Sequence, residues 1–198
     1  MNWDEKFSCD EYVYGKEPND FLASVIDRLP PSSKVLSLCE GEGRNAVFMA
    51  TKGHRVTAVD SSKVGLEKAR RLAAEKGVEI ETVLSDVTLY EIDKNKWDAV
   101  VSIFGHLPPK SRRKVHRSAV EGLKPFGVFI LEAYSPRQLQ YGTGGPKDPE
   151  LLYEIEDLKE DLSGLEFEIA REVVREVREG VFHKGLGSVV QVLAFKRI

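Results

Sequence analysis

The chain has 198 residues, of which 41% are hydrophobic and 31% are charged, a composition typical of a globular domain with its own core. Lys and Arg number 29 against 32 Asp and Glu, so the formal net charge is -3 and no overall basic field is available to hold a polyanion. Two cysteines, a polar N-terminus and no apolar run of membrane-spanning length argue against a disulfide scaffold, a four-cysteine metal site, a secreted protein and a membrane protein. A cytoplasmic enzyme or small-molecule binder is expected.

Short apolar runs alternate with helical patterns along the chain. An N-terminal helix is expected around Leu22, Val25 and Ile26, which recur at helical spacing. The expected strands of the central region are residues 34–39, 55–60, 79–84, 97–103 and 127–131. Helices are expected between them: one after Gly43, one capped by Ser61 or Ser62 and one after Pro109. Alternation of this kind predicts right-handed βαβ units and a mostly parallel sheet.

The pattern changes after residue 132. Residues 141–146 contain three glycines and are expected to form a mobile loop that acts as a lid. Residues 167–177 and 188–196 predict an antiparallel hairpin with its turn over residues 179–187. We therefore expect one domain over residues 1–198, with an N-terminal helical cover (1–30), a cofactor-binding core (31–135) and a lid loop plus C-terminal hairpin (136–198).

The informative polar residues fall at the ends of successive strands. Gly41 and Gly43 follow the first strand, and Asp60 ends the second, 17 residues after Gly43. A carboxylate in that place can accept both hydrogens of a ribose diol. Asp86 follows the third strand, where its carboxylate can accept from an adenine amine while the N–H of Val87 meets a ring nitrogen. Because parallel sheets bind ligands at the carboxyl ends of their strands, the three positions predict one nucleoside site.

With these features the sequence resembles class I S-adenosylmethionine-dependent methyltransferases over roughly residues 30–135. The resemblance is carried by residues 35–46, 56–62, 84–87 and 122–127. More narrowly, Gly43-Arg44-Asn45-Ala46 and an N-terminal pattern containing Tyr14-Gly15 and Pro18-Asn19 resemble the TehB-like branch of tellurite-resistance and thiopurine-methyltransferase-like proteins. The resemblance implies an α/β fold with a Rossmann-like, doubly wound, mostly parallel seven-stranded sheet that has an antiparallel C-terminal hairpin strand.

The resemblance also implies roles for single residues. Residues 39–43 would wrap the methionine portion of S-adenosylmethionine, Asp60 would hold the ribose, Asp86 and Val87 would hold the adenine, and the end of the fourth strand would flank the sulfonium. The cofactor-binding residues expected on this basis are Cys39, Glu40, Gly41, Gly43, Arg44, Asn45, Asp60, Ser61, Asp86, Val87, Ile103 and Phe104.

Two positions depart from the family pattern. Ser37 stands where an acidic residue is common inside the first strand, and Cys39 stands where the first glycine of the loop is usual. Glu40 or Glu42 would then supply the missing carboxylate, and the sequence does not choose between them.

His106 is the expected catalytic residue, because it follows Phe104-Gly105 at the end of the fourth strand and can serve as a base or orient an acceptor. The alternative is a structural histidine bonded to a loop carbonyl. A small-molecule acceptor is expected, either a thiol or an oxyanion of selenium or tellurium. No metal site is expected, and the sequence does not indicate the oligomeric state.

A nucleic-acid partner is not expected. The one basic cluster, Arg112-Arg113-Lys114 with His116-Arg117, reads as a solvated helix face without aromatic stacking residues. Two other functions stay open. Gly41-x-Gly43-x-x-Ala46 also fits a dinucleotide fingerprint, which allows an NAD-dependent oxidoreductase, and the same features allow a non-catalytic S-adenosylmethionine-binding protein.

Overall fold

The computed structural model describes residues 2–180 and 183–198. Its helices are α1 (Trp3–Lys6), α2 (Asp20–Val25), α3 (Arg44–Thr51), α4 (Lys63–Glu75), α5 (Pro109–Gly122) and α6 (Ile155–Asp161), with 3-10 turns at Ile26–Arg28, Pro136–Gln140 and Pro149–Leu151. Its strands are β1 (Lys34–Leu38), β2 (Arg55–Asp60), β3 (Glu81–Leu84), β4 (Trp97–Ile103), β5 (Leu123–Tyr134), β6 (Leu165–Glu179) and β7 (His183–Lys196). None of the helices in the described part of the chain is long and apolar enough to cross a membrane.

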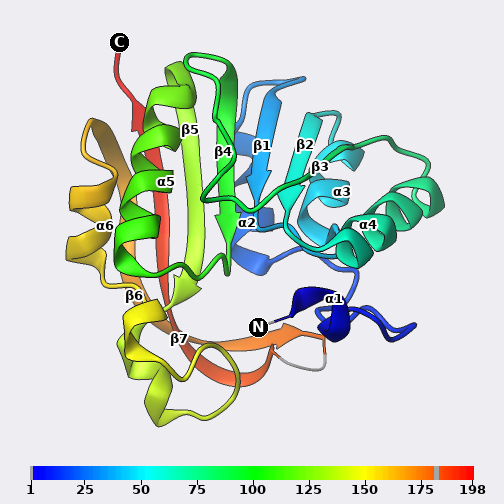
Figure 1. Ribbon diagram of the computed structural model, residues 1–198. Coiled ribbons are helices and arrows are strands. Elements are labelled where there is room, and N and C mark those ends of the chain that lie inside the picture. Colours follow the sequence, from blue (N-terminus) through cyan, green and yellow to red (C-terminus); the bar gives the residue numbers. More distant parts are fainter. Residues whose placement is uncertain (1, 181–182) are drawn as a thin grey trace.

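The strands form one seven-stranded sheet in the order β3-β2-β1-β4-β5-β7-β6. The first five are parallel, and β7 runs antiparallel to both β5 and β6 (Figure 1). This confirms the expected α/β, Rossmann-like sheet with an antiparallel C-terminal hairpin. The strand order reverses next to β1, which places a ligand crevice beyond the carboxyl ends of β1 and β4.

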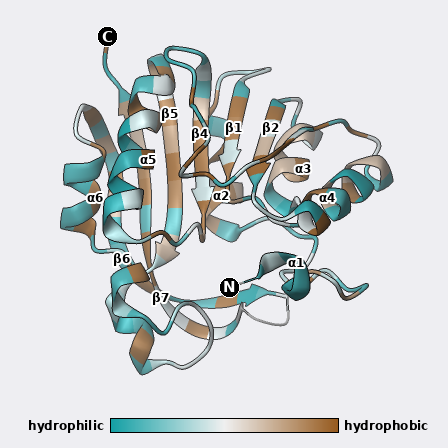
Figure 2. Ribbon diagram, in the orientation of Figure 1, coloured by the Kyte–Doolittle hydropathy of each residue, from teal (hydrophilic) through white to brown (hydrophobic). Residues whose placement is uncertain are grey.

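Helices cover both faces of the sheet. Helices α2 and α3 pack on one face through residues such as Leu22 and Met49, and α5 and α6 pack on the other through Val115 and Leu158. Figure 2 shows hydrophobic residues along the strands and hydrophilic ones on the outward faces of α4 and α5. Because both faces are covered, β1, β4 and β5 are apolar in consecutive positions rather than in alternate ones.

Three expectations are corrected: the extent of the C-terminal turn, the absence of a helix at α6 and the bounds of β5. The predicted turn at 179–187 is too long, since Gly185 and Gly187 pair with Val177 and Arg175 inside the ladder. The glycines that suggested a turn lie in β7 instead, and residues 181–182 of the expected turn lie outside the described part. Helix α6 was not predicted, because it is short and its apolar residues are few. Strand β5 also runs from Leu123 to Tyr134 rather than over residues 127–131.

Candidate functional site

The loop between β1 and α3 makes three turns through the left-handed region of backbone space. Cys39 has φ +55°, Gly41 +63° and Gly43 +90°. At Gly43 a side chain has no room, because a Cβ would lie 2.5 Å from the Cβ of Ala69 on α4. Cys39 adopts the left-handed conformation with a side chain, at a cost of about 1–2 kcal/mol. That conformation explains why a glycine suits this position.

Glu40 places its buried carboxylate at the N-terminus of α3. One oxygen accepts from the backbone N–H groups of Asn45 (3.1 Å) and Ala46 (2.8 Å), and the other accepts from the hydroxyl of Ser37. Burial raises the pKa of Glu40, and these hydrogen bonds oppose the rise. Glu40 therefore brings a carboxylate to the strand position where Ser37 lacks one.

Glu42 faces a different partner. Its carboxylate pairs with the buried ammonium of Lys68 on α4 and accepts from the backbone N–H of Tyr14 at 3.3 Å. Lys68 also donates to the carbonyls of Cys9 (3.0 Å) and Glu11 (2.6 Å). Glu42 thus fastens the N-terminal segment to the loop, and of the two candidate carboxylates only Glu40 contacts Ser37 in this structure.

Asp60 and Asp86 lie beside the same loop. The carboxylate of Asp60 accepts from the N–H of Gly41 and from the N–H of Ser62, both at 2.8 Å, and burial raises its pKa. The carboxylate of Asp86 accepts from the N–H (2.8 Å) and hydroxyl (2.7 Å) of Thr88. Burial raises the pKa of the Cys39 thiol, and the charges of Asp60, Asp86 and Glu40 raise it further. The carboxyl ends of β1, β2 and β3 therefore lie together at one edge of the sheet, and their joint contact with a ligand stays a prediction.

The residues next to these carboxylates divide into buried and exposed positions. Val87 is buried, whereas Ser61 is exposed and Ser62, its neighbour, caps α4 by accepting from the N–H of Gly65 at 2.9 Å. The hydroxyl of Ser62 in turn donates to Asp4 at 2.6 Å, which seats α1 over the start of α4. The N-terminal segment thus lies across the carboxyl end of the sheet (Figure 1).

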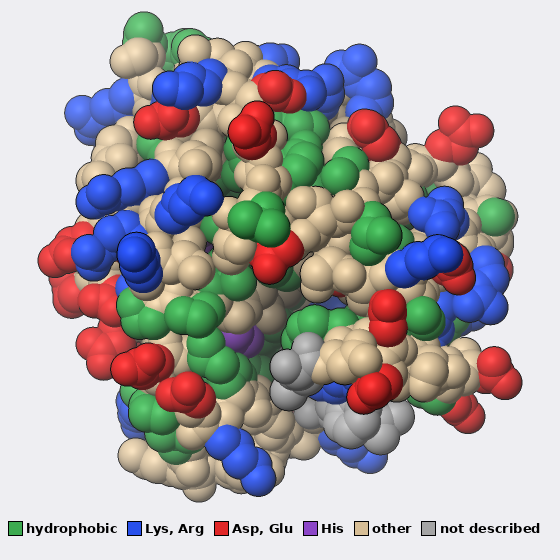
Figure 3. All heavy atoms as spheres, in the orientation of Figure 1, with side chains coloured by type: hydrophobic (Ala, Val, Ile, Leu, Met, Phe, Trp, Pro, Cys, Tyr) green, Lys and Arg blue, Asp and Glu red, His purple; other side chains and the backbone are tan. Residues whose placement is uncertain are grey.

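The end of β4 forms another part of the candidate site. Ile103 is buried, and Phe104 follows it with φ +53°, a strained conformation for an aromatic residue. The Phe104 ring lies 4.7 Å from that of Tyr134, measured between centroids. Figure 3 shows the molecule hollowed between the carboxyl end of the sheet and the C-terminal hairpin.

His106 is held by main-chain groups. Its Nδ1 lies 2.7 Å from the carbonyl oxygen of Leu151, and its Nε2 accepts from the N–H of Tyr134 at 3.4 Å. Because a carbonyl only accepts, these contacts assign the proton to Nδ1 and the lone pair to Nε2. The contact with a loop carbonyl matches the structural alternative, and a catalytic role for His106 stays a prediction.

Arg44 and Asn45 begin α3, but their side chains reach toward other segments. Arg44 pairs with Glu179 of β6, and the Asn45 amide oxygen accepts from the N–H of Asn19 at 2.9 Å. Neither contact leads to the loop at residues 39–43. Their predicted contacts with a cofactor stay predictions, while their present bonds join the N-terminal segment and the hairpin to α3.

These contacts belong to a larger buried group, which we call the hairpin charge cluster: Arg44, Glu132, Arg175 and Glu179. Arg175 pairs with both Glu132 and Glu179, and Asn19 donates to the same two carboxylates at 2.7 and 2.8 Å. Sequence reasoning missed this cluster. Its signal was Glu132, a carboxylate in an otherwise apolar strand, which needs a buried partner.

The expected lid loop is tied to its surroundings. The amide nitrogen of Gln138 donates to Thr143 and to the carbonyl of Gly144, both at 3.1 Å, and the Thr143 hydroxyl donates to the carbonyl of Leu186 in β7. Gly145 lies against Tyr134, since a Cβ there would be 2.6 Å from its ring. Motion of this loop stays a prediction.

The basic cluster on α5 is not a solvated face throughout, which corrects the expectation. Arg112 and His116 are buried against α6, where the guanidinium of Arg112 meets Asp161 at 2.6 Å and His116 Nδ1 lies 3.4 Å from the same carboxylate. The solvated interpretation failed because Asp161 lies 49 residues after Arg112, on a helix that was not predicted.

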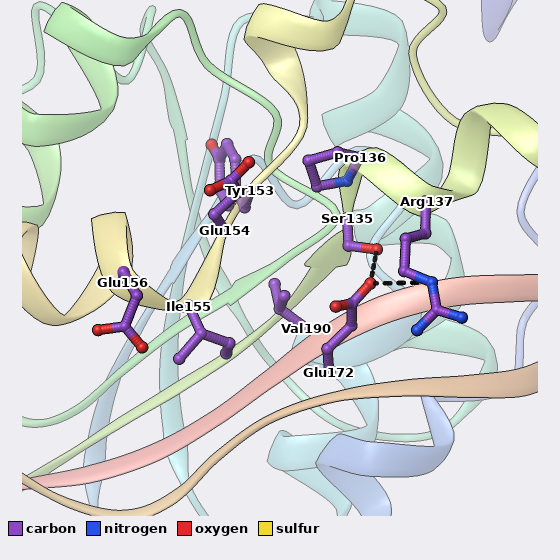
Figure 4. A pocket seen from close by; sticks show the side chains of 9 residues that line it. All are labelled: Ser135, Pro136, Arg137, Tyr153, Glu154, Ile155, Glu156, Glu172 and Val190. Carbon is purple, nitrogen blue, oxygen red and sulfur yellow. Dashed lines mark hydrogen bonds and ion pairs between the residues drawn. The ribbon is translucent and has the colours of Figure 1, made fainter.

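A pocket of about 260 Å³ lies away from the loop at residues 39–43, between the end of β5 and the start of α6. Figure 4 shows Glu172 within it, directed toward Ser135 and Arg137. Within the described residues, no group of three or more His, Cys, Asp or Glu is placed to hold a metal ion.

Comparison with known proteins finds similarity to methyltransferases. Residues 35–127 match the family model described as a methyltransferase domain. A tRNA (uracil(54)-C(5))-methyltransferase from Pyrococcus horikoshii is 26% identical over 174 residues, covering 79% of this chain and 39% of the relative. The chain spans less than two thirds of the length of the curated relatives it matches.

Solved structures share the fold. A protein studied for the conversion of a disulfide bond into a thioacetal group in echinomycin biosynthesis superposes with a TM-score of 0.75 at 18% identity, covering 98% of this chain and 87% of its own. TehB from Haemophilus influenzae gives 0.72 at 19% identity, covering 98% and 66%. Residues 35–127 are thus similar to a methyltransferase domain, and the sheet order gives the chain the same fold as these solved structures.

Proposed function

We propose that this chain transfers the methyl group of S-adenosylmethionine to a small, soft acceptor, with a thiol as the best fit. The observation that supports it most is the convergence of Glu40, Asp60 and Asp86 around the loop at residues 39–43. These carboxylates lie at the ends of three neighbouring parallel strands, next to a backbone that turns tightly enough to approach a ligand.

The residues present fit this cofactor. The two oxygens of the Asp60 carboxylate accept the backbone N–H groups of Gly41 and Ser62, and a carboxylate has further acceptor sites for a ribose hydroxyl. Glu40 provides negative charge for the methionine ammonium, and Asp86 with Val87 provides an acceptor and a donor for adenine. When bound, the cofactor supplies an electrophilic methyl group on a sulfonium.

In this proposal, the residues of the chain hold the acceptor and orient it toward the methyl group. Alignment of an acceptor with the methyl group contributes roughly 7–11 kcal/mol to rate acceleration. Phe104 and His106, at the end of β4, are the residues we assign to the acceptor. For a thiol that must lose its proton, Nε2 of His106 would take it in place of the 3.4 Å hydrogen bond from the N–H of Tyr134, since Nδ1 already carries a proton directed at Leu151.

Charge favours a thiol over a selenium or tellurium oxyanion. An oxyanion needs a cation to recognise it, and two arginines of the hairpin charge cluster are neutralised: Arg44 by Glu179, and Arg175 by Glu132 and Glu179. Releasing Arg175 would leave the buried carboxylate of Glu132 without its cationic partner, which is costly.

The branch assignment is also part of the proposal. The motif Gly43-Arg44-Asn45-Ala46 and the N-terminal Pro18-Asn19 support a TehB-like placement, because Asn45 and Asn19 bond to each other in the structure. A nucleic-acid acceptor is disfavoured, because Arg112 and His116 of the basic cluster are buried against Asp161. The antiparallel β7 departs from the all-parallel dinucleotide-binding order and argues against the oxidoreductase alternative.

The identity of the acceptor is tested with two probes in separate reactions. The purified chain is incubated with radiolabelled S-adenosylmethionine and either 4-nitrothiophenol or sodium tellurite, and methylated product is counted. We expect turnover with the thiol and at least tenfold less with tellurite. Preference for tellurite would overturn the thiol assignment. Binding of S-adenosylhomocysteine without methylation across a wider acceptor panel would favour a non-catalytic binding protein.

A further inference from the structure

The loop at residues 104–107, which follows β4, is held from behind by one hydroxyl group. The side chain of Tyr153 donates to the carbonyl oxygen of Gly105 at 2.6 Å and accepts from the N–H of Leu107 at 2.8 Å. These two backbone groups lie on either side of His106. The hydroxyl therefore fixes the loop directly before and directly after the residue expected to act on the acceptor.

The ring that carries this hydroxyl is itself locked in place. Tyr153 is fully buried between the 3-10 turn at Pro149–Leu151 and α6, and its N–H donates to the carbonyl of Tyr134 at 2.9 Å. The guanidinium of Arg112 lies 5.0 Å from the centre of the Tyr153 ring, and the His106 ring lies 5.3 Å from it. Figure 4 shows Tyr153 at the edge of the neighbouring pocket, beside Glu154.

The loop requires such support because its backbone is strained. Phe104 has φ +53°, which costs of the order of 1–3 kcal/mol and persists only where the surroundings hold it. Gly105 is pressed against the sheet, since a Cβ there would lie 3.0 Å from the Ser102 hydroxyl and 3.2 Å from the sulfur of Cys39. Without a group that forms hydrogen bonds with both Gly105 and Leu107, the turn would relax toward an unstrained backbone conformation.

We infer that Tyr153 is a positioning residue for methyl transfer, holding Phe104 and His106 in the geometry that the acceptor requires. The inference rests on the proposed function. The Tyr153 hydroxyl contacts the backbone of the loop rather than the side chain of His106. It therefore acts on the acceptor through the loop, and the residues assigned to the cofactor at 39–43 lie outside its hydrogen bonds.

The test is Tyr153→Phe, which keeps the ring and removes only the hydroxyl. Tyr12→Phe is the matched control, because its hydroxyl also donates to a backbone carbonyl, that of Lys68 at 2.9 Å, away from the loop at residues 104–107. Amide exchange at Leu107 and the ¹⁵N resonances of His106 are measured by NMR. Affinity for S-adenosylhomocysteine is measured by calorimetry, and kcat and KM with 4-nitrothiophenol are measured by product formation.

We expect Tyr153→Phe to speed exchange at Leu107 and to shift the His106 resonances, with S-adenosylhomocysteine affinity within about twofold of the parent. We expect kcat to fall by roughly 10- to 100-fold, the size of effect that a small misplacement produces. Tyr12→Phe should leave the loop signals and kcat unchanged.

Unchanged Leu107 exchange and His106 resonances in Tyr153→Phe would overturn the inference. So would a kcat equal to that of the control. If the parent chain methylates no acceptor, the proposed function fails, and the loop signals alone then decide whether Tyr153 positions the loop.

Discussion

Glu40 accepts a hydrogen bond from Ser37, three residues earlier in the chain, and so returns a carboxylate to a strand position that carries a hydroxyl. The same side chain caps α3 through Asn45 and Ala46. Glu40 thus keeps a negative charge beside the site through a side chain attached three positions after Ser37.

The first prediction separates Glu40 from Glu42. Glu40→Gln keeps acceptors for the α3 N–H groups, so stability should change by less than about 1 kcal/mol, while loss of the charge should weaken S-adenosylhomocysteine binding by about tenfold. Glu42→Gln leaves Lys68 buried without its charge partner and should lower the free energy of unfolding by about 3–5 kcal/mol. Urea denaturation and calorimetry measure both quantities. Equal effects on binding would contradict the distinction.

A second prediction concerns the backbone at Cys39. Because its φ is +55°, Cys39→Gly should be more stable than Cys39→Ala by about 0.5–1 kcal/mol, the left-handed cost reduced by the greater freedom of glycine in the unfolded chain. Comparing these two variants cancels the loss of the sulfur, which both share. Greater stability of the alanine variant in urea denaturation would show that the residue is unstrained.

The pH dependence of stability tests the contact between α5 and α6. Burial alone would raise the pKa of Asp161, but hydrogen bonds from His116 and Arg112 outweigh it and hold the pKa at about 2. A lowered folded-state pKa contributes stability above the unfolded value, near 4, and loses it as pH falls from about 4 toward 2. The parent chain should therefore lose about 2 kcal/mol more than Asp161→Asn over this interval.

Glu160→Gln is the control for this measurement, because Glu160 is exposed and lies 3.8 Å from Arg113. Its stability should follow the parent through the same interval. Parallel pH profiles for the parent chain and Asp161→Asn would refute the assignment.

Asn19 allows a test of the hairpin charge cluster. Its amide donates to both Glu132 and Glu179, so Asn19→Asp would place a third carboxylate against two buried ones. We expect the free energy of unfolding to fall by about 3 kcal/mol or more at pH 7, and the deficit to shrink at pH 5 as the new acid becomes protonated. Asn2→Asp, at the exposed cap of α1, should change stability by less than about 0.5 kcal/mol. A deficit that does not depend on pH would contradict the electrostatic explanation.

The parts of the fold that local pattern determines could be predicted from the sequence. The strands Arg55–Asp60 and Trp97–Ile103 are apolar runs with clear ends, and both were predicted with their exact bounds. The place of Asp60 beside Gly41 follows from the general geometry of parallel sheets.

What sequence reasoning missed depends on contacts between distant residues. Tyr153 holds the loop at residues 104–107 from 46 and 48 positions away, and nothing in the residues around it indicates a role at the site. The burial of Arg112 required Asp161 on a helix of seven residues. Local periodicity cannot report such pairs, because it does not say which elements meet.

The most direct test of the account is calorimetric titration of S-adenosylhomocysteine into the parent chain, Asp60→Ala and the exposed control Asp27→Ala. If Asp60 holds the ribose, Asp60→Ala should bind at least tenfold more weakly, as expected for a lost hydrogen bond to a charged group, and Asp27→Ala should bind like the parent. Thermal unfolding without ligand would verify that each variant is folded. Undiminished affinity in Asp60→Ala would contradict the nucleoside site on which the proposed methyl transfer depends.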